Sequence, residues 1–151
     1  MIPPAMIDLA DDADTARLGE AVARALRTGE AVCLTGPLGA GKSTLARALV
    51  RALTTPGEDV PSPTFTLVQF YDGTAFPLAH FDLYRLTSPE EAWEIGLDEA
   101  LDEGAVIIEW PQRLEGALPP DRLDIEIAFD GEGRRARLSA HGAWEGRALE
   151  F

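Results

Sequence analysis

The sequence is short of cysteine and of basic residues, and each shortage excludes a class of protein. Cys33 is the only cysteine, so the chain cannot form an internal disulfide, and we expect Cys33 to pack as a small apolar residue. The 13 lysines and arginines stand against 26 aspartates and glutamates, which gives a net charge of −13. Because contacts to phosphates need a basic surface, this balance disfavours a stand-alone nucleic-acid binder. Solubility alone is an equally good reason for such acidity.

Long apolar runs are also missing. No stretch approaches the length of a transmembrane span, and the start at Met1–Ala5 has neither the basic residues nor the apolar segment of a signal peptide. These absences predict a cytoplasmic protein with no membrane contact. At 151 residues, of which 46% are hydrophobic, the chain can bury one substantial core but not two. We therefore expect residues 1–151 to form a single domain.

A P-loop motif is present at residues 36–43, where the sequence reads Gly-Pro-Leu-Gly-Ala-Gly-Lys-Ser. It matches the pattern G-x-x-x-x-G-K-[ST] at every fixed position. The run 30–35 before it is apolar enough for a buried parallel strand, and residues 44–53 after it carry apolar side chains at helical spacing. Strand, turn and helix thus follow in the required order, which favours a nucleotide-binding loop over a chance glycine turn.

The chemistry of a P-loop follows from its geometry. Glycines let backbone N–H groups face a phosphate, and the N-terminus of the following helix adds a partial positive charge. We expect Lys42 to reach the β- and γ-phosphates of ATP, and the Ser43 hydroxyl to be a ligand of Mg²⁺. The expected nucleotide-binding residues here are Leu38, Gly39, Ala40, Gly41, Lys42, Ser43 and Thr44.

Helical and strand patterns continue along the rest of the chain. A helix capped by Asp11 or Asp12 and stopped by Gly29 precedes the P-loop strand. The other expected elements are strands 64–71 and 75–84 around a turn at 72–74, helices 89–94 and 97–101, a strand at 104–110, and strands 123–129 and 136–140 around a turn at 130–133. They predict an α/β, single-domain P-loop NTPase fold with a mixed, largely parallel central sheet flanked by helices and a C-terminal β-hairpin.

Two acidic residues stand where strands should end. Binding of Mg²⁺ and activation of water both require carboxylates near the γ-phosphate of a P-loop nucleotide. Asp82 follows one apolar run, and Glu109 follows another in the arrangement of a Walker B strand. Either carboxylate could instead cap a turn or pair with Arg85 or Arg113.

Three further residues have both a functional and a structural interpretation. Thr64 can place its hydroxyl near the γ-phosphate if the loop 62–65 folds over the site, and the alternative is an ordinary proline turn. His80 could shuttle protons or be a structural residue of its strand. Trp110 could belong to the core or to a contact surface, and its place beside Pro111 at a strand end favours partial exposure.

Four motifs occur together and in order in this chain: Gly39–Ser43, Ser62–Val68, His80–Leu86 and Ile108–Pro111. With them the chain resembles the TsaE family, also called YjeE, which comprises bacterial ATPases needed for threonylcarbamoyladenosine modification of tRNA. The resemblance runs from about Asp11 to about Ala140. It implies ATP or ADP and Mg²⁺ as cofactors.

The resemblance also implies roles for particular residues. The catalytic set becomes Lys42, Asp82, Glu109 and Thr64, and the magnesium ligands become Ser43, Glu109 and Asp82. The family's pocket also draws on the start of the first helix and on the C-terminal hairpin, which points to Asp11, Thr15 and Arg134. Pro37 and Gln112 depart from acids that are frequent at these positions in the family, so no charge role is assigned to either.

As a partner, the resemblance implies the TsaB–TsaD heterodimer. That pair transfers the threonylcarbamoyl group to adenosine 37 of tRNA, and a protein of this family is the ATPase that permits turnover, weak alone and dependent on its partners. The acidic charge fits tRNA contact mainly through the partners. Two other functions remain open at this point: a small-molecule kinase, and a nucleotide-sensing interaction module without significant turnover.

Overall fold

The computed structural model describes residues 5–149. Met1–Pro4, on which the expectation about a signal peptide mostly rests, lie outside the described residues, as do Glu150 and Phe151. Within the described range, no helix is both long enough and apolar enough to cross a membrane.

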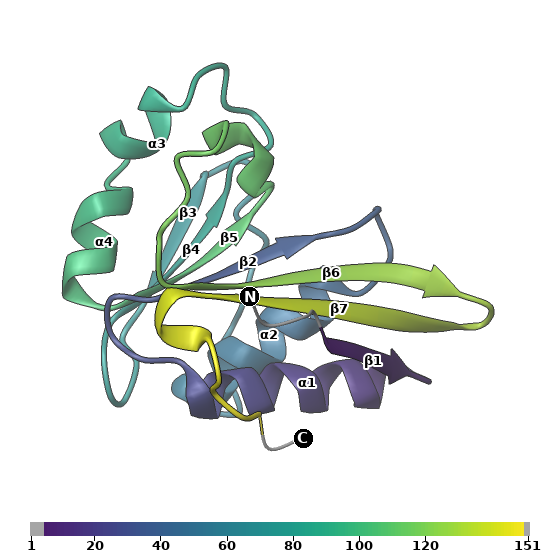
Figure 1. Ribbon diagram of the computed structural model, residues 1–151. Helices are drawn as coiled ribbons and strands as arrows, with labels where there is room; N and C mark the ends of the chain where they lie inside the picture. Colours follow the sequence, from purple (N-terminus) through teal and green to yellow (C-terminus); the bar gives the residue numbers. More distant parts are fainter. Residues whose placement is uncertain (1–4, 150–151) are drawn as a thin grey trace.

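Within residues 5–149, the strands form one mixed sheet of seven (Figure 1). The inner strands β6, β2, β5 and β4 run parallel to one another, whereas β7 and β1 on one side and β3 on the other pair antiparallel. This arrangement confirms the predicted fold class. In their order across the sheet the strands are β1 (Ala5–Leu9), β7 (Gly133–His141), β6 (Arg122–Asp130), β2 (Ala31–Thr35), β5 (Ala105–Glu109), β4 (Leu78–Asp82) and β3 (Val68–Tyr71).

Helices α1 (Asp12–Ala25) and α2 (Lys42–Leu53) lie side by side against one face of the sheet (Figure 1). Their close approach depends on Gly19 of α1, because a Cβ at that position would stand 2.6 Å from the backbone oxygen of Leu45. On the opposite face, the shorter helices α3 (Glu90–Glu94) and α4 (Leu97–Glu103) lie near β4 and β5. Single 3₁₀ turns follow β5 at Pro111–Leu114 and β7 at Gly142–Trp144.

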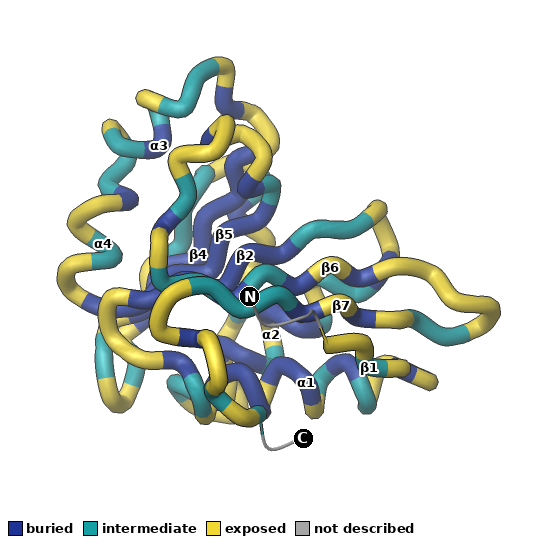
Figure 2. The backbone as a smooth tube through the Cα atoms, viewed as in Figure 1, coloured by how far each residue is buried: buried dark blue, intermediate teal, exposed yellow. Residues whose placement is uncertain are grey.

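The core has two parts, one on each face of the sheet. Val32 and Leu34 of β2 belong to the cluster under α1 and α2, while Ala31 and Cys33 belong to the cluster on the α3 and α4 side. Figure 2 shows the inner strands buried and the far end of the β6–β7 hairpin exposed. As expected, Cys33 packs as a buried apolar residue, and burial raises the pKa of its thiol, which keeps it protonated and unreactive.

The local elements follow the sequence patterns with three exceptions. The predicted strand 75–84 is confined to Leu78–Asp82, and residues 72–77 form a longer loop than the predicted turn at 72–74. The predicted strand 64–71 begins only at Val68, because the N–H of Leu67 donates to the Pro63 oxygen and closes a turn, with Leu67 at φ 69°. The strand β1 was not predicted. It is an edge strand of five residues in which Leu9 alone is fully buried. The sequence therefore shows no alternation of apolar and polar residues that would predict a strand.

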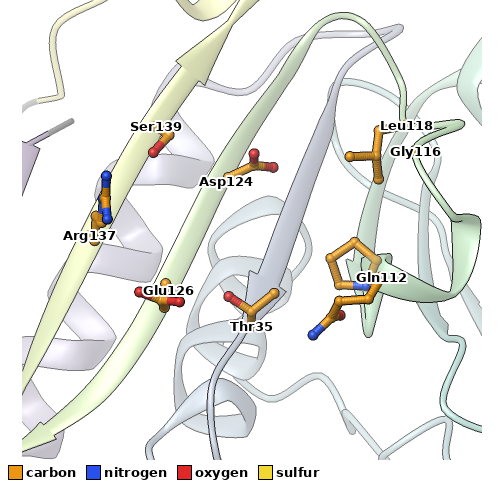
Figure 3. A pocket seen from close by; sticks show the side chains of 9 residues that line it. Thr35, Gln112, Gly116, Leu118, Asp124, Glu126, Arg137 and Ser139 are labelled. Carbon is orange, nitrogen blue, oxygen red and sulfur yellow. The ribbon is translucent and has the colours of Figure 1, made fainter. Parts of the chain in front are cut away.

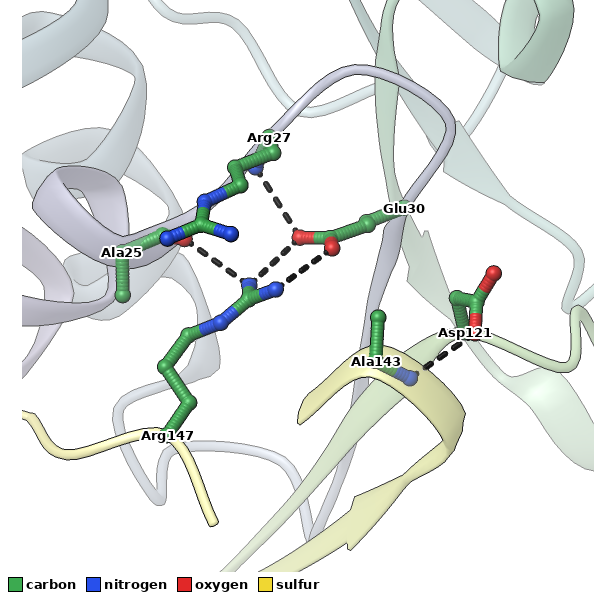
Figure 4. Close-up of polar contacts among 6 residues, drawn as sticks. All are labelled: Ala25, Arg27, Glu30, Asp121, Ala143 and Arg147. Atoms are coloured by element: carbon green, nitrogen blue, oxygen red, sulfur yellow. Dashed lines mark hydrogen bonds and ion pairs between the residues drawn. The ribbon is translucent and has the colours of Figure 1, made fainter. Parts of the chain in front are cut away.

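A buried ion pair fastens the C-terminal segment to the sheet (Figure 4). Both carboxylate oxygens of Glu30, just before β2, accept from the Arg147 guanidinium, at 2.7 and 2.8 Å. Arg147 also donates to the Ala25 oxygen at the end of α1 and stacks on the Trp144 ring. The hydrogen bond to Glu30 raises the pKa of Arg147, so the guanidinium stays charged. This contact joins α1, β2 and the chain end.

We expect Arg147→Ala to lower the free energy of unfolding by about 3 kcal/mol, because it leaves the buried Glu30 carboxylate without its counter-ion. Urea denaturation followed by circular dichroism measures the change. Arg135→Ala is the control: Arg135 also forms ion pairs, with Asp8 and Asp130, but its side chain is 46% exposed. A loss for Arg147→Ala no larger than that of the control would contradict a stabilising role for the pair.

Candidate functional site

The P-loop connects the end of β2 to the start of α2. Gly41 precedes the helix at φ 111°, a left-handed conformation that suits glycine, and no side chain caps the helix. The first turn of α2 also carries no acidic residue. The N–H groups at this helix end are therefore free to face an anion, as the motif predicts.

A cleft of about 790 Å³ opens at this helix end. It contains every predicted catalytic and magnesium-binding residue, and most of the predicted P-loop residues. The full lining is Asp12, Leu38, Gly39, Gly41, Lys42, Ser43, Thr44, Ser62, Thr64, Asp82, Tyr84, Glu109, Trp110 and Arg134.

Three predicted residues support the cleft and do not line it. Asp11 caps α1, because its carboxylate accepts from the Asp14 N–H at 2.9 Å, and the next residue, Asp12, is the one that lines the cleft. Thr15 is 1% exposed, and its methyl group packs against Gly41. Ala40 is fully buried in the loop, with its N–H on the Pro37 oxygen.

Asp82 and Glu109 stand side by side at the ends of adjacent parallel strands. They are register partners between β4 and β5, and they are only 6% and 7% exposed. The carboxylate of Asp82 accepts from the Tyr84 N–H at 3.0 Å and from the Thr64 hydroxyl at 3.3 Å. Asp82 therefore does cap a turn, as one alternative held, and it faces the cleft as well.

Glu109 has a different partner. Its Oε2 lies 2.7 Å from Nε2 of His80, and both side chains are buried. The alternative pairing of the two acids with arginines is wrong, because Arg85 stacks over Phe65 and Arg113 over Tyr84. Among the described residues, neither Asp82 nor Glu109 forms an ion pair with an arginine.

The Thr64 loop closes one side of the cleft. Ser62 and Thr64 share a hydrogen bond of 2.7 Å between their hydroxyl oxygens, and Thr64 reaches Asp82 as described above. Both residues line the cleft. Thr64 therefore lies at the cleft, and its role toward a γ-phosphate stays a prediction.

Aromatic rings form another wall, and sequence reasoning missed part of it. The Lys42 ammonium lies 4.8 Å from the centroid of the Trp110 ring, which in turn contacts Tyr84 at 4.8 Å between centroids. Trp110 is half-buried, as expected, and takes the left-handed backbone conformation, φ 61°. Tyr84 was not selected as a site residue, although its position in the His80–Leu86 motif was a usable signal.

Arg134 reaches the P-loop from the start of β7. Its guanidinium donates to the Gly39 oxygen at 3.4 Å and lies over the Phe129 ring. Among the described residues, Lys42 and Arg134 are the only basic side chains that line the cleft. The predicted contribution of the C-terminal hairpin to the site is therefore geometrically possible.

The oxygen donors fit a magnesium ion that a nucleotide brings with it. No group of three or more His, Cys, Asp or Glu side chains suited to a metal is found in residues 5–149. Magnesium does not need such a cage, because it binds through one or two carboxylates, water and substrate phosphates. Ser43, Asp82 and Glu109 supply oxygen ligands of this kind in one cleft.

A second cavity, of about 320 Å³, lies on the other side of the sheet (Figure 3). Asp124 and Glu126 of β6 and Arg137 and Ser139 of β7 stand on one side of it, with Gln112 across from them. None of the predicted site residues lines it. The chemistry predicted from the motifs therefore belongs to the cleft at α2.

Comparison with known proteins agrees with this geometry. The family described as threonylcarbamoyl adenosine biosynthesis protein TsaE matches residues 9–137. The chain belongs to the TsaE family. The match includes the P-loop, the Thr64 loop, both acidic strand ends and Arg134.

Relatives in the TsaE family match over most of their length. The TsaE proteins of Rickettsia felis and Aquifex aeolicus are 35% and 39% identical to this chain, over 97% and 86% of it and over 85% and 92% of their own lengths. The TsaE protein of Treponema pallidum is 39% identical over 81% of the chain and 90% of its own. The crystal structure of Bacillus subtilis YdiB superimposes with a TM-score of 0.78 at 28% identity, covering 96% of this chain and 91% of that one.

We expect Lys42→Ala to weaken binding of ATP by at least tenfold, because a charge-assisted phosphate contact contributes about 1.5–3 kcal/mol. Isothermal titration calorimetry measures the affinity, and thermal melting checks that the fold is intact. Arg27→Ala is the matched control, since it removes a positive charge before β2, at the opposite end of that strand from the P-loop. Equal affinities of Lys42→Ala and wild type would show that the P-loop does not bind the phosphates.

Proposed function

We propose that this protein is the Mg²⁺-dependent, ATP-binding and ATP-hydrolysing component of the machinery that makes threonylcarbamoyladenosine at position 37 of bacterial tRNA, and that it works in the cytoplasm. One observation carries the proposal. An uncapped P-loop helix faces two buried carboxylates across a single cleft, in a chain of the TsaE family. Membership in the TsaE family supports a role in threonylcarbamoyladenosine biosynthesis, and the residues of the cleft support binding and hydrolysis of ATP.

Each side chain at the cleft has a role that suits phosphoryl transfer. Lys42 and the N–H groups at the start of α2 would hold the phosphates, and Ser43, Asp82 and Glu109 would hold the ion directly or through water. Bound magnesium would neutralise charge that develops on the phosphate oxygens. Thr64, whose hydroxyl donates to Asp82, would respond to an occupied γ-phosphate site.

The scarcity of cations at the cleft supports dependence on partners. Efficient phosphoryl transfer to one positioned water needs bulk water excluded and the γ-phosphate surrounded by positive groups. The described cleft offers only Lys42 and Arg134 as such groups. The same scarcity disfavours the small-molecule kinase, which requires a basic lid. We therefore propose slow hydrolysis by the protein alone and stimulation by the TsaB–TsaD pair.

The rim of the cleft offers a surface that a partner can cover. Leu38 is 97% and Phe65 78% exposed, and Tyr84 is half exposed. Leu38 belongs to the P-loop and Phe65 follows Thr64, so both adjoin residues that would sense the nucleotide. A partner can read the nucleotide state only if it binds the two states with different affinity.

We expect Glu109→Gln to reduce Mg²⁺-dependent turnover more than it reduces nucleotide binding, because the amide keeps the shape but loses the charge. Phosphate release is measured across a magnesium titration with TsaB–TsaD present. Glu126→Gln, on the opposite side of the sheet, is the matched control. A wild-type magnesium profile for Glu109→Gln would remove this residue from the site.

We also expect TsaB–TsaD to bind this protein with different affinity in ATP, ADP and no nucleotide, and to stimulate hydrolysis. Pull-down and phosphate-release assays test both, with Phe65→Ala as the surface variant. Nucleotide-dependent binding without turnover would establish the sensing module instead. Equal partner binding in all three conditions, with unstimulated hydrolysis, would refute the proposed coupling.

A further inference from the structure

His80 is a buried polar side chain with a single polar contact. The residue is 3% exposed, and its Nε2 lies 2.7 Å from Oε2 of Glu109. Its other ring nitrogen, Nδ1, has no hydrogen-bond partner among the described residues. A histidine that served only to stabilise the core would be expected to satisfy both nitrogens, because an unpaired buried polar atom is unfavourable. Among the described residues, the only hydrogen-bond partner of the His80 ring is therefore Glu109.

The direction of this hydrogen bond follows from the chemistry of the two groups. An ionised carboxylate can only accept, so for this contact Nε2 of the ring must carry the proton, and His80 then donates to Oε2. Glu109 makes no other side-chain hydrogen bond within residues 5–149. Its second oxygen, Oε1, is therefore available to a ligand in the cleft that Glu109 lines.

The surroundings of the pair connect it to the P-loop helix. His80 and Glu109 line a small cavity of about 60 Å³ together with Ser43 and Arg47 of α2 and with Ser62. Ser43 and Glu109 also line the main cleft. Glu109 thus lines both spaces, whereas His80 lines only the small cavity. Such a ring can fix the carboxylate but is not itself among the residues that line the main cleft.

We propose that His80 is a positioning residue for Glu109: its Nε2–H holds Oε2 and so directs the other oxygen toward magnesium. This inference rests on the proposed function, because it requires an ion at the cleft. Hydrogen bonds from outside the coordination shell orient metal ligands, and losing one typically costs about 10–100-fold in metal affinity. His80 therefore acts through Glu109, without contact to the nucleotide.

Two amide variants separate this role from simple filling of space. The side-chain N–H of Gln extends to about the position of Nε2, whereas that of Asn ends near Nδ1. We expect His80→Gln to keep the hydrogen bond to Glu109, and His80→Asn and His80→Ala to lose it. Because Gln and Asn are both polar amides, their difference reports on reach and not on polarity.

The experiment measures binding of a fluorescent, non-hydrolysable ATP analogue at increasing Mg²⁺ concentration and in EDTA, without any hydrolysis step. For His80→Asn and His80→Ala we expect the Mg²⁺ concentration of half-maximal effect to rise about tenfold, with affinity in EDTA unchanged. For His80→Gln we expect a rise of no more than about threefold. In a Glu109→Gln background, His80→Ala should add nothing further, because the residue through which it acts is already altered.

The possible outcomes distinguish failure of this inference from failure of the proposed function. If all three variants keep the wild-type magnesium dependence, or lose only thermal stability, His80 is a structural residue and the inference is overturned. If His80→Ala does not fold, the comparison of Gln with Asn still decides. If the wild-type protein binds no nucleotide with or without magnesium, the proposed function fails, and this inference fails with it.

Discussion

The parallel pairing of β2, β5 and β4 is the constraint on which the site depends. Parallel strands in register bring their carboxyl ends to one edge of the sheet. Glu109 pairs with Leu34 of β2 and with Asp82 of β4, so both acids and the P-loop that follows β2 meet at that edge. The helix α2 then begins opposite the acids, without a side-chain cap of its own. A cleft with positive and negative walls follows from the topology.

Buried acidic residues lie at both ends of the parallel strands, and they differ in how many of their oxygens are hydrogen-bonded. At the amino end of β2, Glu30 is fully engaged by Arg147, and the result is a closed contact that holds the chain end. At the carboxyl end, Glu109 has one partner, His80, and Asp82 accepts from Thr64 and a backbone N–H. These acids keep lone pairs for a ligand. The buried acids of the cleft thus have unused hydrogen-bond acceptors, whereas both oxygens of Glu30 are bonded to Arg147. This difference distinguishes the site from the structural ion pair.

Local patterns predicted most of the fold and most of the residues that the structure brings together at the cleft. The P-loop, the Asp11 cap and the apolar runs ending at Asp82 and Glu109 are each readable within a few residues, and the structure brings them together. Contacts between distant segments were not readable: Glu109 with His80, Lys42 over Trp110, and Glu30 with Arg147 join residues 29 or more positions apart. The turn before Val68 was missed because left-handed Leu67 follows no sequence rule.

We propose that a magnesium nucleotide binds between the start of α2 and the two acidic strand ends. A crystal structure with Mg²⁺ and a non-hydrolysable ATP analogue would show this site. We expect the β- and γ-phosphates at the N–H groups of α2, the ion about 2.1 Å from the Ser43 hydroxyl oxygen, and Asp82 and Glu109 facing the ion directly or through one water. Phosphates bound elsewhere, or an ion remote from both carboxylates, would contradict it.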